Sequence, residues 1–293
     1  MLKPPGPTSA QFVAAVRRRL GRHVRIGHAG TLDPGAAGVL PLCLGTSTRL
    51  TEYLQLPLKG YRFELILGAD TDTQDAQGRV LAQRSATGVE RQALEAVLAG
   101  LVGEGMQQVP LYSARRVDGR RLYSYARSGQ SVSTPEVPVR IAALQLLAWS
   151  PGEHARALCD VRCGSGTYVR ALCARIGVRL DVGGHMGHLI RYAAGGLQSD
   201  ACLTLEEWEA APADGLESLC LEPAGALAFL PGLTLDPVEA DGVRHGRPPG
   251  PRRSADTPGL LRLLDSAGHL LAVGRRTLED GVATFALEKV LTQ

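Results

Sequence analysis

The sequence predicts an α+β fold in which a large N-terminal part, residues 1–230, precedes a small β-rich module, residues 231–293. Helix-like and strand-like stretches alternate without the roughly 30-residue rhythm of βαβ units, which argues against a doubly wound parallel sheet. Around Pro231 and Gly232 the pattern changes to short alternating stretches separated by glycine turns. A chain of 293 residues is long enough for this division.

Three helices are indicated by a Ser/Thr-x-x-Glu/Gln capping pattern followed by apolar residues at helical spacing. The patterns begin at Thr8, Thr87 and Thr204. The first helix is expected to end at Gly21, and the second to continue through Leu101. A fourth helix is expected at about 167–176, after a glycine-rich break at 164–166.

Alternating apolar residues predict strands on both sides of residue 231. In the larger part they cover 61–68, 80–83, 139–149 and 155–163. In the C-terminal module they cover 260–264, 270–273 and 282–287. The segment 111–127 is expected to be a loop that leads into a short helix.

Composition argues against membrane-spanning and disulfide-rich classes. No apolar run reaches the ~18 residues of a membrane span, and residues 1–9 lack the apolar stretch of a signal peptide, so we expect a cytoplasmic protein. The six cysteines lie inside apolar stretches without close pairing, which predicts buried, reduced thiols. His185 and His188 could supply two metal ligands at helical spacing. No acidic or thiol partner accompanies them, so we expect no metal.

Positive charge is concentrated although the net charge is only +3. Five arginines lie at 111–127 against one acid, Asp118, and tyrosines are interleaved with them. This pattern suits contacts to RNA phosphates and bases, although a solvated surface has the same composition. A segment with this many charges has little apolar area to bury, so we expect it to be mobile until RNA binds.

The segment 27–40 is a glycine-rich loop with a lone carboxylate, Asp33, followed by Pro34. Proline stiffens the backbone, and the glycines allow it to approach a ligand closely. An Asp-Pro pair is also typical of an ordinary turn. The residues alone therefore leave open whether Asp33 is catalytic.

This loop resembles the signature G-H-x-G-x-L-D-P-x-A-x-G-x-L of TruB-type pseudouridine synthases. Further segments resemble the family's K-P-x-G-x-T-S, K-x-Y, T-D-T-x-D-x-x-G and C-S-x-G-T-Y-I-R motifs, and they occur at 3–9, 59–61, 71–78 and 163–170. The resemblance covers about 3–208, with a looser likeness of the C-terminal module to a PUA domain. It implies a mixed, largely antiparallel central sheet flanked by helices and loops, a tRNA-facing insertion at about 104–130 and an RNA-binding PUA-like domain.

The resemblance implies a tRNA pseudouridine synthase that isomerises uridine 55 in the T loop. Such an enzyme needs no cofactor, binds the T arm of tRNA, and is expected to act as a monomer without an obligate protein partner. Asp33 would be the nucleophile, attacking either uracil C6 or ribose C1′. Arg170 would offset the cost of burying its charge, and Tyr61 would lie against the flipped base and move the C5 proton.

The remaining site residues are implied in the same way. His28 would fill the space that the flipped base leaves, and Tyr168 and Leu189 would complete the pocket. Asp75 would contact the RNA around the flipped nucleotide, and a turn-capping role is equally compatible with its position.

The main alternative is a non-catalytic RNA-binding or tRNA-folding protein on the same scaffold. The joint presence of Asp33, Tyr61 and Arg170 argues against it, because binding alone needs no carboxylate beneath the base. A glycosidase would need a second acid, and none stands out.

Overall fold

The computed structural model describes residues 1–21, 23–253 and 256–291, with the backbone alone at Arg127. The chain forms two compact units, which we call unit 1 and unit 2. Unit 1 comprises Met1–Pro34, Val39–Pro57 and Ala194–Gln293, and unit 2 comprises Gly35–Gly38 and Leu58–Ala193.

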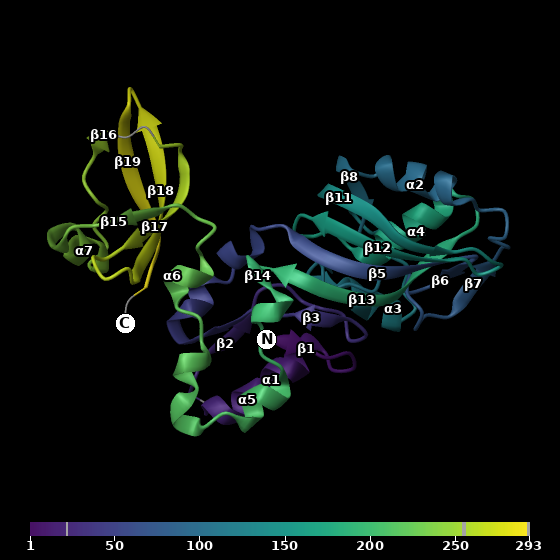
Figure 1. Cartoon of the computed structure of the whole chain (residues 1–293), viewed down its shortest axis with the longest axis horizontal. Helices are drawn as coiled ribbons and strands as arrows, with labels where there is room; N and C mark the ends of the chain where they lie inside the picture. The colour runs from purple at the N-terminus through teal and green to yellow at the C-terminus, as the bar shows by residue number, and fades with distance from the viewer. Residues whose placement is uncertain (22, 254–255, 292–293) are drawn as a thin grey trace. The chain divides into compact units, whose positions relative to one another are not determined.

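Unit 2 is built on a mixed sheet (Figure 1). Its strands run in the order β3 (Ala37–Val39), β13 (Gly184–Ala194), β5 (Lys59–Leu67), β12 (Arg156–Cys163), β11 (Glu136–Ser150) and β8 (Gly103–Gln108). Only the β3–β13 pair among these is parallel, so the expected largely antiparallel sheet is confirmed. At that pair Gly38 has φ +112°, and a Cβ there would lie 2.2 Å from the Arg191 carbonyl oxygen, so only glycine fits.

One face of this sheet is covered by two helices, α2 (Arg91–Ala99) and α4 (Val169–Arg179), which pack against each other and against the strands (Figure 1). Along β5, Tyr61, Phe63 and Leu65 are buried while Arg62 is exposed. This alternation is the period-2 pattern of a strand with one covered face. It explains why β5 could be predicted.

The expected capping box at Thr87 is wrong. α2 begins at Arg91 after Glu90, and no side chain caps it. The Thr87 N–H instead donates to Ser85 Oγ at 3.3 Å, which is a local turn contact that competes with a helix start.

Two hairpins and a short helix complete unit 2. They are β6 (Ala69–Thr71) with β7 (Val80–Gln83), β9 (Arg116–Val117) with β10 (Arg120–Arg121), and α3 (Leu122–Arg127). The short helix in 111–127 is therefore confirmed. Leu122 is fully buried against Val109, Val137 and Val139, so this charged segment does have an apolar anchor. That the segment is mobile until RNA binds stays a prediction.

Unit 1 starts with β1 (Leu2–Lys3) and α1 (Ser9–Leu20), followed by the antiparallel pair β2 (Ile26–His28) and β4 (Leu42–Leu44). Further along lie short 3₁₀ turns, β14 (Leu197–Gln198), α5 (Leu205–Ala210) and α6 (Pro223–Ala226). The capping boxes expected at Thr8 and Thr204 are both confirmed.

The C-terminal part of unit 1 is a five-stranded sheet with one helix, α7 (Pro237–Arg244). The strand order is β15 (Gly232–Thr234), β17 (Gly259–Leu264), β18 (Leu270–Glu279), β19 (Val282–Val290) and β16 (Arg252–Arg253). The first strand of this sheet thus begins at Gly232, where the sequence pattern changes to short alternating stretches. Leu270 and Val273 of this sheet share a hydrophobic core with Leu50 and Leu54, which also belong to unit 1. A domain boundary at residue 231 therefore stays a prediction.

The six cysteines are free thiols. Cys43, Cys159, Cys163 and Cys173 are buried as expected, but Cys220 is exposed because it follows a run of short 3₁₀ turns. Among the helices that the structure describes, none is long and apolar enough to cross a membrane.

Candidate active site

Asp33 belongs to unit 1, and its loop is fixed on both sides of this half-buried residue. On one side, Ser9 Oγ donates to the Leu32 carbonyl at 3.0 Å and accepts from the Leu32 N–H at 2.9 Å. On the other side, the Gly6 N–H donates to the Pro34 carbonyl at 2.8 Å. The segment 3–9, which the sequence identified only as a motif, therefore holds the loop in place.

Lys3 is a buried residue beside Asp33 that the sequence did not single out. Its side chain is 1% exposed, and Nζ donates to the carbonyls of Pro4, Pro7 and Pro34 at 2.7, 2.9 and 3.2 Å. Burial lowers the pKa of Lys3, and the nearby Asp33 carboxylate partly opposes this. The sequence shows a lone lysine in a segment without acids, but it does not say whether this lysine is buried or which carbonyls its ammonium contacts.

His28 is the second expected site residue in unit 1. It ends β2, pairs with Leu42 of β4 and is half-buried. Four residues of the chain lie between it and Asp33. Its expected role beside a flipped base stays a prediction.

In unit 2, Tyr61 and Leu189 lie on the adjacent strands β5 and β13, and each is 7% exposed. Tyr61 pairs with Arg191, and Leu189 pairs with Phe63. Lys59, two residues before Tyr61, shares its side of β5. Burial, with the charge of Arg191 adding to it, lowers the pKa of Lys59 to about 8.

Arg170 lies in the first turn of α4, directly after Tyr168 and Val169, and is 4% exposed. Its guanidinium donates to the carbonyls of Thr73 and Tyr112, both at 2.9 Å. Its Nε lies 3.9 Å from Asp75 Oδ2. The structure therefore brings Arg170, Asp75 and Tyr168 together in unit 2.

Asp75 also caps its own turn. Its Oδ1 accepts from Thr73 Oγ1 at 2.6 Å and from the Gln77 N–H at 3.0 Å. The turn-capping interpretation is thus confirmed. A contact of Asp75 to RNA, like the pairing of Asp33 with Arg170, stays a prediction.

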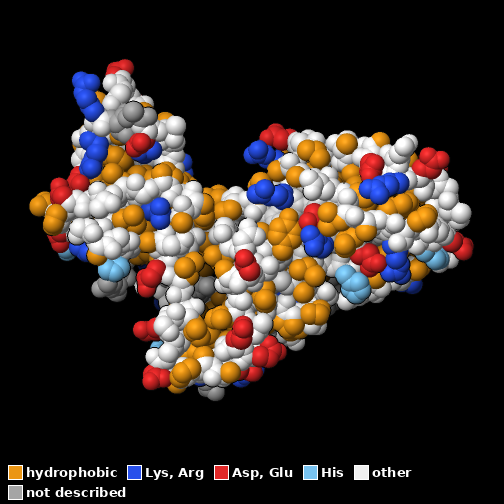
Figure 2. Space-filling model, in the orientation of Figure 1, with side chains coloured by type: hydrophobic (Ala, Val, Ile, Leu, Met, Phe, Trp, Pro, Cys, Tyr) orange, Lys and Arg blue, Asp and Glu red, His pale blue; other side chains and the backbone are white. Residues whose placement is uncertain are grey.

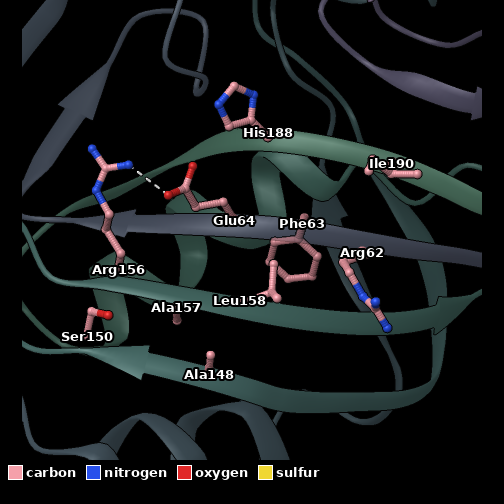
Figure 3. A pocket seen from close by; sticks show the side chains of 10 residues that line it. All are labelled: Arg62, Phe63, Glu64, Ala148, Ser150, Arg156, Ala157, Leu158, His188 and Ile190. Carbon is pink, nitrogen blue, oxygen red and sulfur yellow. Dashed lines mark hydrogen bonds and ion pairs between the residues drawn. The ribbon is translucent and has the colours of Figure 1, made fainter. Parts of the chain in front are cut away.

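A cavity of about 360 Å³ lies on the uncovered face of the unit 2 sheet (Figure 3). Arg156 and Glu64 form an ion pair of 2.8 Å at its edge, and Leu158 and Ile190 line it (Figure 3). None of the expected site residues is among its described lining residues. We therefore do not assign the chemistry to this cavity.

The two histidines considered as metal ligands lie on β13, not on a helix. His185 is buried and its Nδ1 lies 2.9 Å from the Ala69 carbonyl oxygen, whereas His188 is exposed and lines the cavity of Figure 3. Residues three apart on a strand point to opposite faces, so the premise of helical spacing is wrong.

Known proteins similar to this chain indicate its family. The family model "TruB family pseudouridylate synthase (N terminal domain)" matches residues 17–169. tRNA pseudouridine synthase B of Moorella thermoacetica is 42% identical over 284 residues, which cover 94% of this chain and 92% of that protein. The protein of the same name from Heliobacterium modesticaldum is 39% identical over 293 residues, which cover 100% and 94%.

Two solved structures share the fold at 23% identity. A chain of a Cbf5-Nop10-Gar1 complex has a TM-score of 0.74 over 99% of this chain and 83% of its own. A chain of an H/ACA RNP bound to a substrate RNA containing 2′-deoxyuridine has a TM-score of 0.74 over 100% and 84%. These two matches show the fold, and the family model and the near full-length relatives show the family. The chain belongs to the TruB family of pseudouridylate synthases.

Proposed function

We propose that this protein isomerises uridine 55 in the T loop of tRNA to pseudouridine. The observation that carries the proposal is the fixed Asp33 loop, held through Leu32 and Pro34 by the segment 3–9. A rigid carboxylate in a loop is what a nucleophile requires. Relatives that carry the name tRNA pseudouridine synthase B extend over nearly the whole chain, which supports tRNA as the substrate.

The reaction conserves the atoms of the nucleotide. The N1–C1′ bond breaks, a C5–C1′ bond forms, the C5 proton leaves and N1 gains a proton. Asp33 acts as the nucleophile in its ionised form, and Arg170 offsets the cost of holding that charge away from water. The Tyr61 phenol lies against the base and moves the C5 proton.

The uracil must leave its stack before Asp33 can reach it. His28 fills the vacated space, Leu189 and Tyr168 form walls of the pocket, and Asp75 contacts the RNA beside the flipped nucleotide. No electrons are exchanged in the reaction. The chain's own side chains therefore suffice for it, and we propose that the enzyme uses no metal or organic cofactor.

RNA binding is assigned to two surfaces. In the insertion the arginine side chains are exposed at 115, 116, 120 and 121, and Arg120 lies 4.5 Å from the centre of the Tyr125 ring. In residues 231–293, proposed to be a PUA-like domain, basic side chains gather over the C-terminal sheet (Figure 2). Both surfaces can neutralise phosphates of the T arm. We propose that the protein acts in the cytoplasm as a monomer.

The test is release of tritium from a T-arm stem-loop that carries [5-³H]uridine at position 55 alone. The purified protein should release the label without any other macromolecule. A stem-loop labelled only at another loop uridine is the matched control and should release none. Binding of the stem-loop without release would instead support the non-catalytic RNA-folding alternative and would contradict the proposal.

A further inference from the structure

Gln107 of β8 lies beside the start of α4 and is 5% exposed. Its side-chain Nε2 donates to the Tyr168 carbonyl at 3.0 Å, and the Tyr168 N–H donates to Oε1 at 2.8 Å. A carboxamide presents one donor and one acceptor side by side, so it matches both backbone groups of a single residue. The two bonds fix the position and the orientation of the Tyr168 backbone.

This contact holds a helix start that lacks a side-chain cap. Tyr168 is the N-cap residue of α4, and its own side chain makes no capping hydrogen bond. The first N–H groups of a helix have no intrahelical partners, and an uncapped start is weakly held. A second anchor joins the same two elements, because Arg175 of α4 donates to the Met106 carbonyl at 2.8 Å. Met106 pairs with Pro138, which has no N–H to offer that carbonyl.

The same stretch of chain also holds Arg170. Tyr112, five residues after Gln107, accepts from the Arg170 guanidinium at 2.9 Å. The segment 107–112 thus fixes both the backbone at the start of α4 and the guanidinium in its first turn. We propose that Gln107 is a positioning residue that sets the place of Arg170 in the active site. The proposal rests on the proposed function, because it takes Arg170 as the partner of the ionised Asp33.

Removal of the amide should slow the chemistry without weakening RNA binding. In Gln107→Ala the first turn of α4 loses its anchor, and a displacement of about 1 Å in a catalytic group costs on the order of 100-fold in rate. We expect kcat to fall by about 10- to 100-fold. We expect the Kd for the T-arm stem-loop to change by less than about threefold, because exposed phosphate contacts elsewhere supply the affinity.

Gln107→Glu provides a second measurement, the pH dependence of kcat, which would not change if Gln107 had a merely structural role. A protonated carboxyl has the shape of the amide and offers both a donor and an acceptor, whereas a carboxylate only accepts and faces the Tyr168 carbonyl. A buried carboxyl titrates above its ordinary pKa of about 4.3. The ratio of the variant's kcat to the wild-type kcat should therefore rise several-fold as the pH falls from about 8 to about 5.5. Taking the ratio cancels the titration of groups that both proteins share.

The matched control is Gln108→Glu, at the exposed neighbouring glutamine, for which the same ratio should not change with pH. Rates are measured at saturating stem-loop, well below the unfolding temperature of each variant. A flat ratio for Gln107→Glu, or a wild-type kcat for Gln107→Ala, overturns the inference. If Gln107→Ala does not fold, the pH dependence of the Gln107→Glu rate ratio still tests the proposal. A wild-type protein that forms no pseudouridine would refute the proposed function itself, which separates the two failures.

Discussion

Replacing Lys59 by methionine should stabilise the protein while slowing its reaction. Lys59 is 7% exposed, and no hydrogen bond or ion pair to its ammonium occurs within the part of the chain that the structure describes. Arg191, 1% exposed, lies close enough to lower its pKa further, and the buried Cys163 thiol pairs across from it. The charged form of Lys59 is therefore held at a cost in folding free energy.

The size and sign of that cost follow from the pKa of Lys59. Burial lowers it from its ordinary value of 10.5 to about 8. Between these two values the unfolded chain binds a proton that the folded protein does not, so the free energy of unfolding rises with pH across this window. Below pH 8 the folded protein carries the full penalty, which amounts to roughly 3 kcal/mol. Methionine keeps the apolar stem and removes the charge.

Urea denaturation of wild type and Lys59→Met at pH 7, 8.5 and 10 measures the effect. The variant should be more stable by up to roughly 3 kcal/mol at pH 7, and the difference should shrink towards zero by about pH 10. Lys289→Met is the matched control, since Lys289 is 41% exposed and pairs with Glu52, and this variant should not be more stable than wild type at pH 7. A variant no more stable than wild type at pH 7, or a difference that is constant up to pH 10, refutes the reasoning.

The same variant should lower kcat. A lysine that is retained at such a cost, two residues from Tyr61, is typical of a functional site. We expect at least a tenfold loss in the rate of tritium release, on the order of what one misplaced or missing electrostatic group costs. Unchanged turnover would show that the buried charge serves no catalytic purpose.

Four further predictions concern the nucleophile, the insertion and the cofactor. Asp33→Asn should abolish turnover and leave the Kd for tRNA within about tenfold, because affinity is spread over many phosphate contacts; measurable turnover would disprove the assignment. Alanine at all four exposed arginines of the insertion should raise Kd and reduce the slope of log Kd against log salt by about 3; an unchanged slope would exclude phosphate contacts. Leu122→Ala should cost about 2–5 kcal/mol and speed hydrogen exchange across 109–139; unchanged exchange would show that Leu122 is no anchor. Dialysis against EDTA should leave the rate on a stem-loop unchanged, and a loss that one divalent ion restores would contradict this.

Local features of the fold could be predicted because they depend on neighbours in sequence. The capping boxes at Thr8 and Thr204 and the alternation along β5 are of this kind. The same pattern failed at Thr87, where Ser85 offers a competing hydroxyl two residues away. A capping pattern is therefore informative only where no nearby side chain takes the same backbone group.

Long-range features could not be predicted in the same way. Nothing in the local pattern places β13 between β5 and β3, or pairs Gly38 with Arg191 in parallel. The same limit applies to the site. The motifs identified Asp33, but the contacts of Lys3 to backbone carbonyls are absent from any side-chain pattern, because every residue carries a carbonyl.

The strand that carries Tyr61 shows how such long-range contacts hold the site. Gly60 lies between Lys59 and Tyr61, and a glycine inside a strand weakens it because it offers no side chain to pack. The Tyr192 ring occupies the space, since a Cβ at Gly60 would lie 2.3 Å from its Cε2. Tyr192 reaches this place because the β5–β13 register shifts between Arg191 and Ala193, as in a β-bulge. An aromatic ring that covers a cross-strand glycine compensates for the missing side chain. Gly60 and Tyr192 are thus coupled, and together they fix the strand between Lys59 and Tyr61.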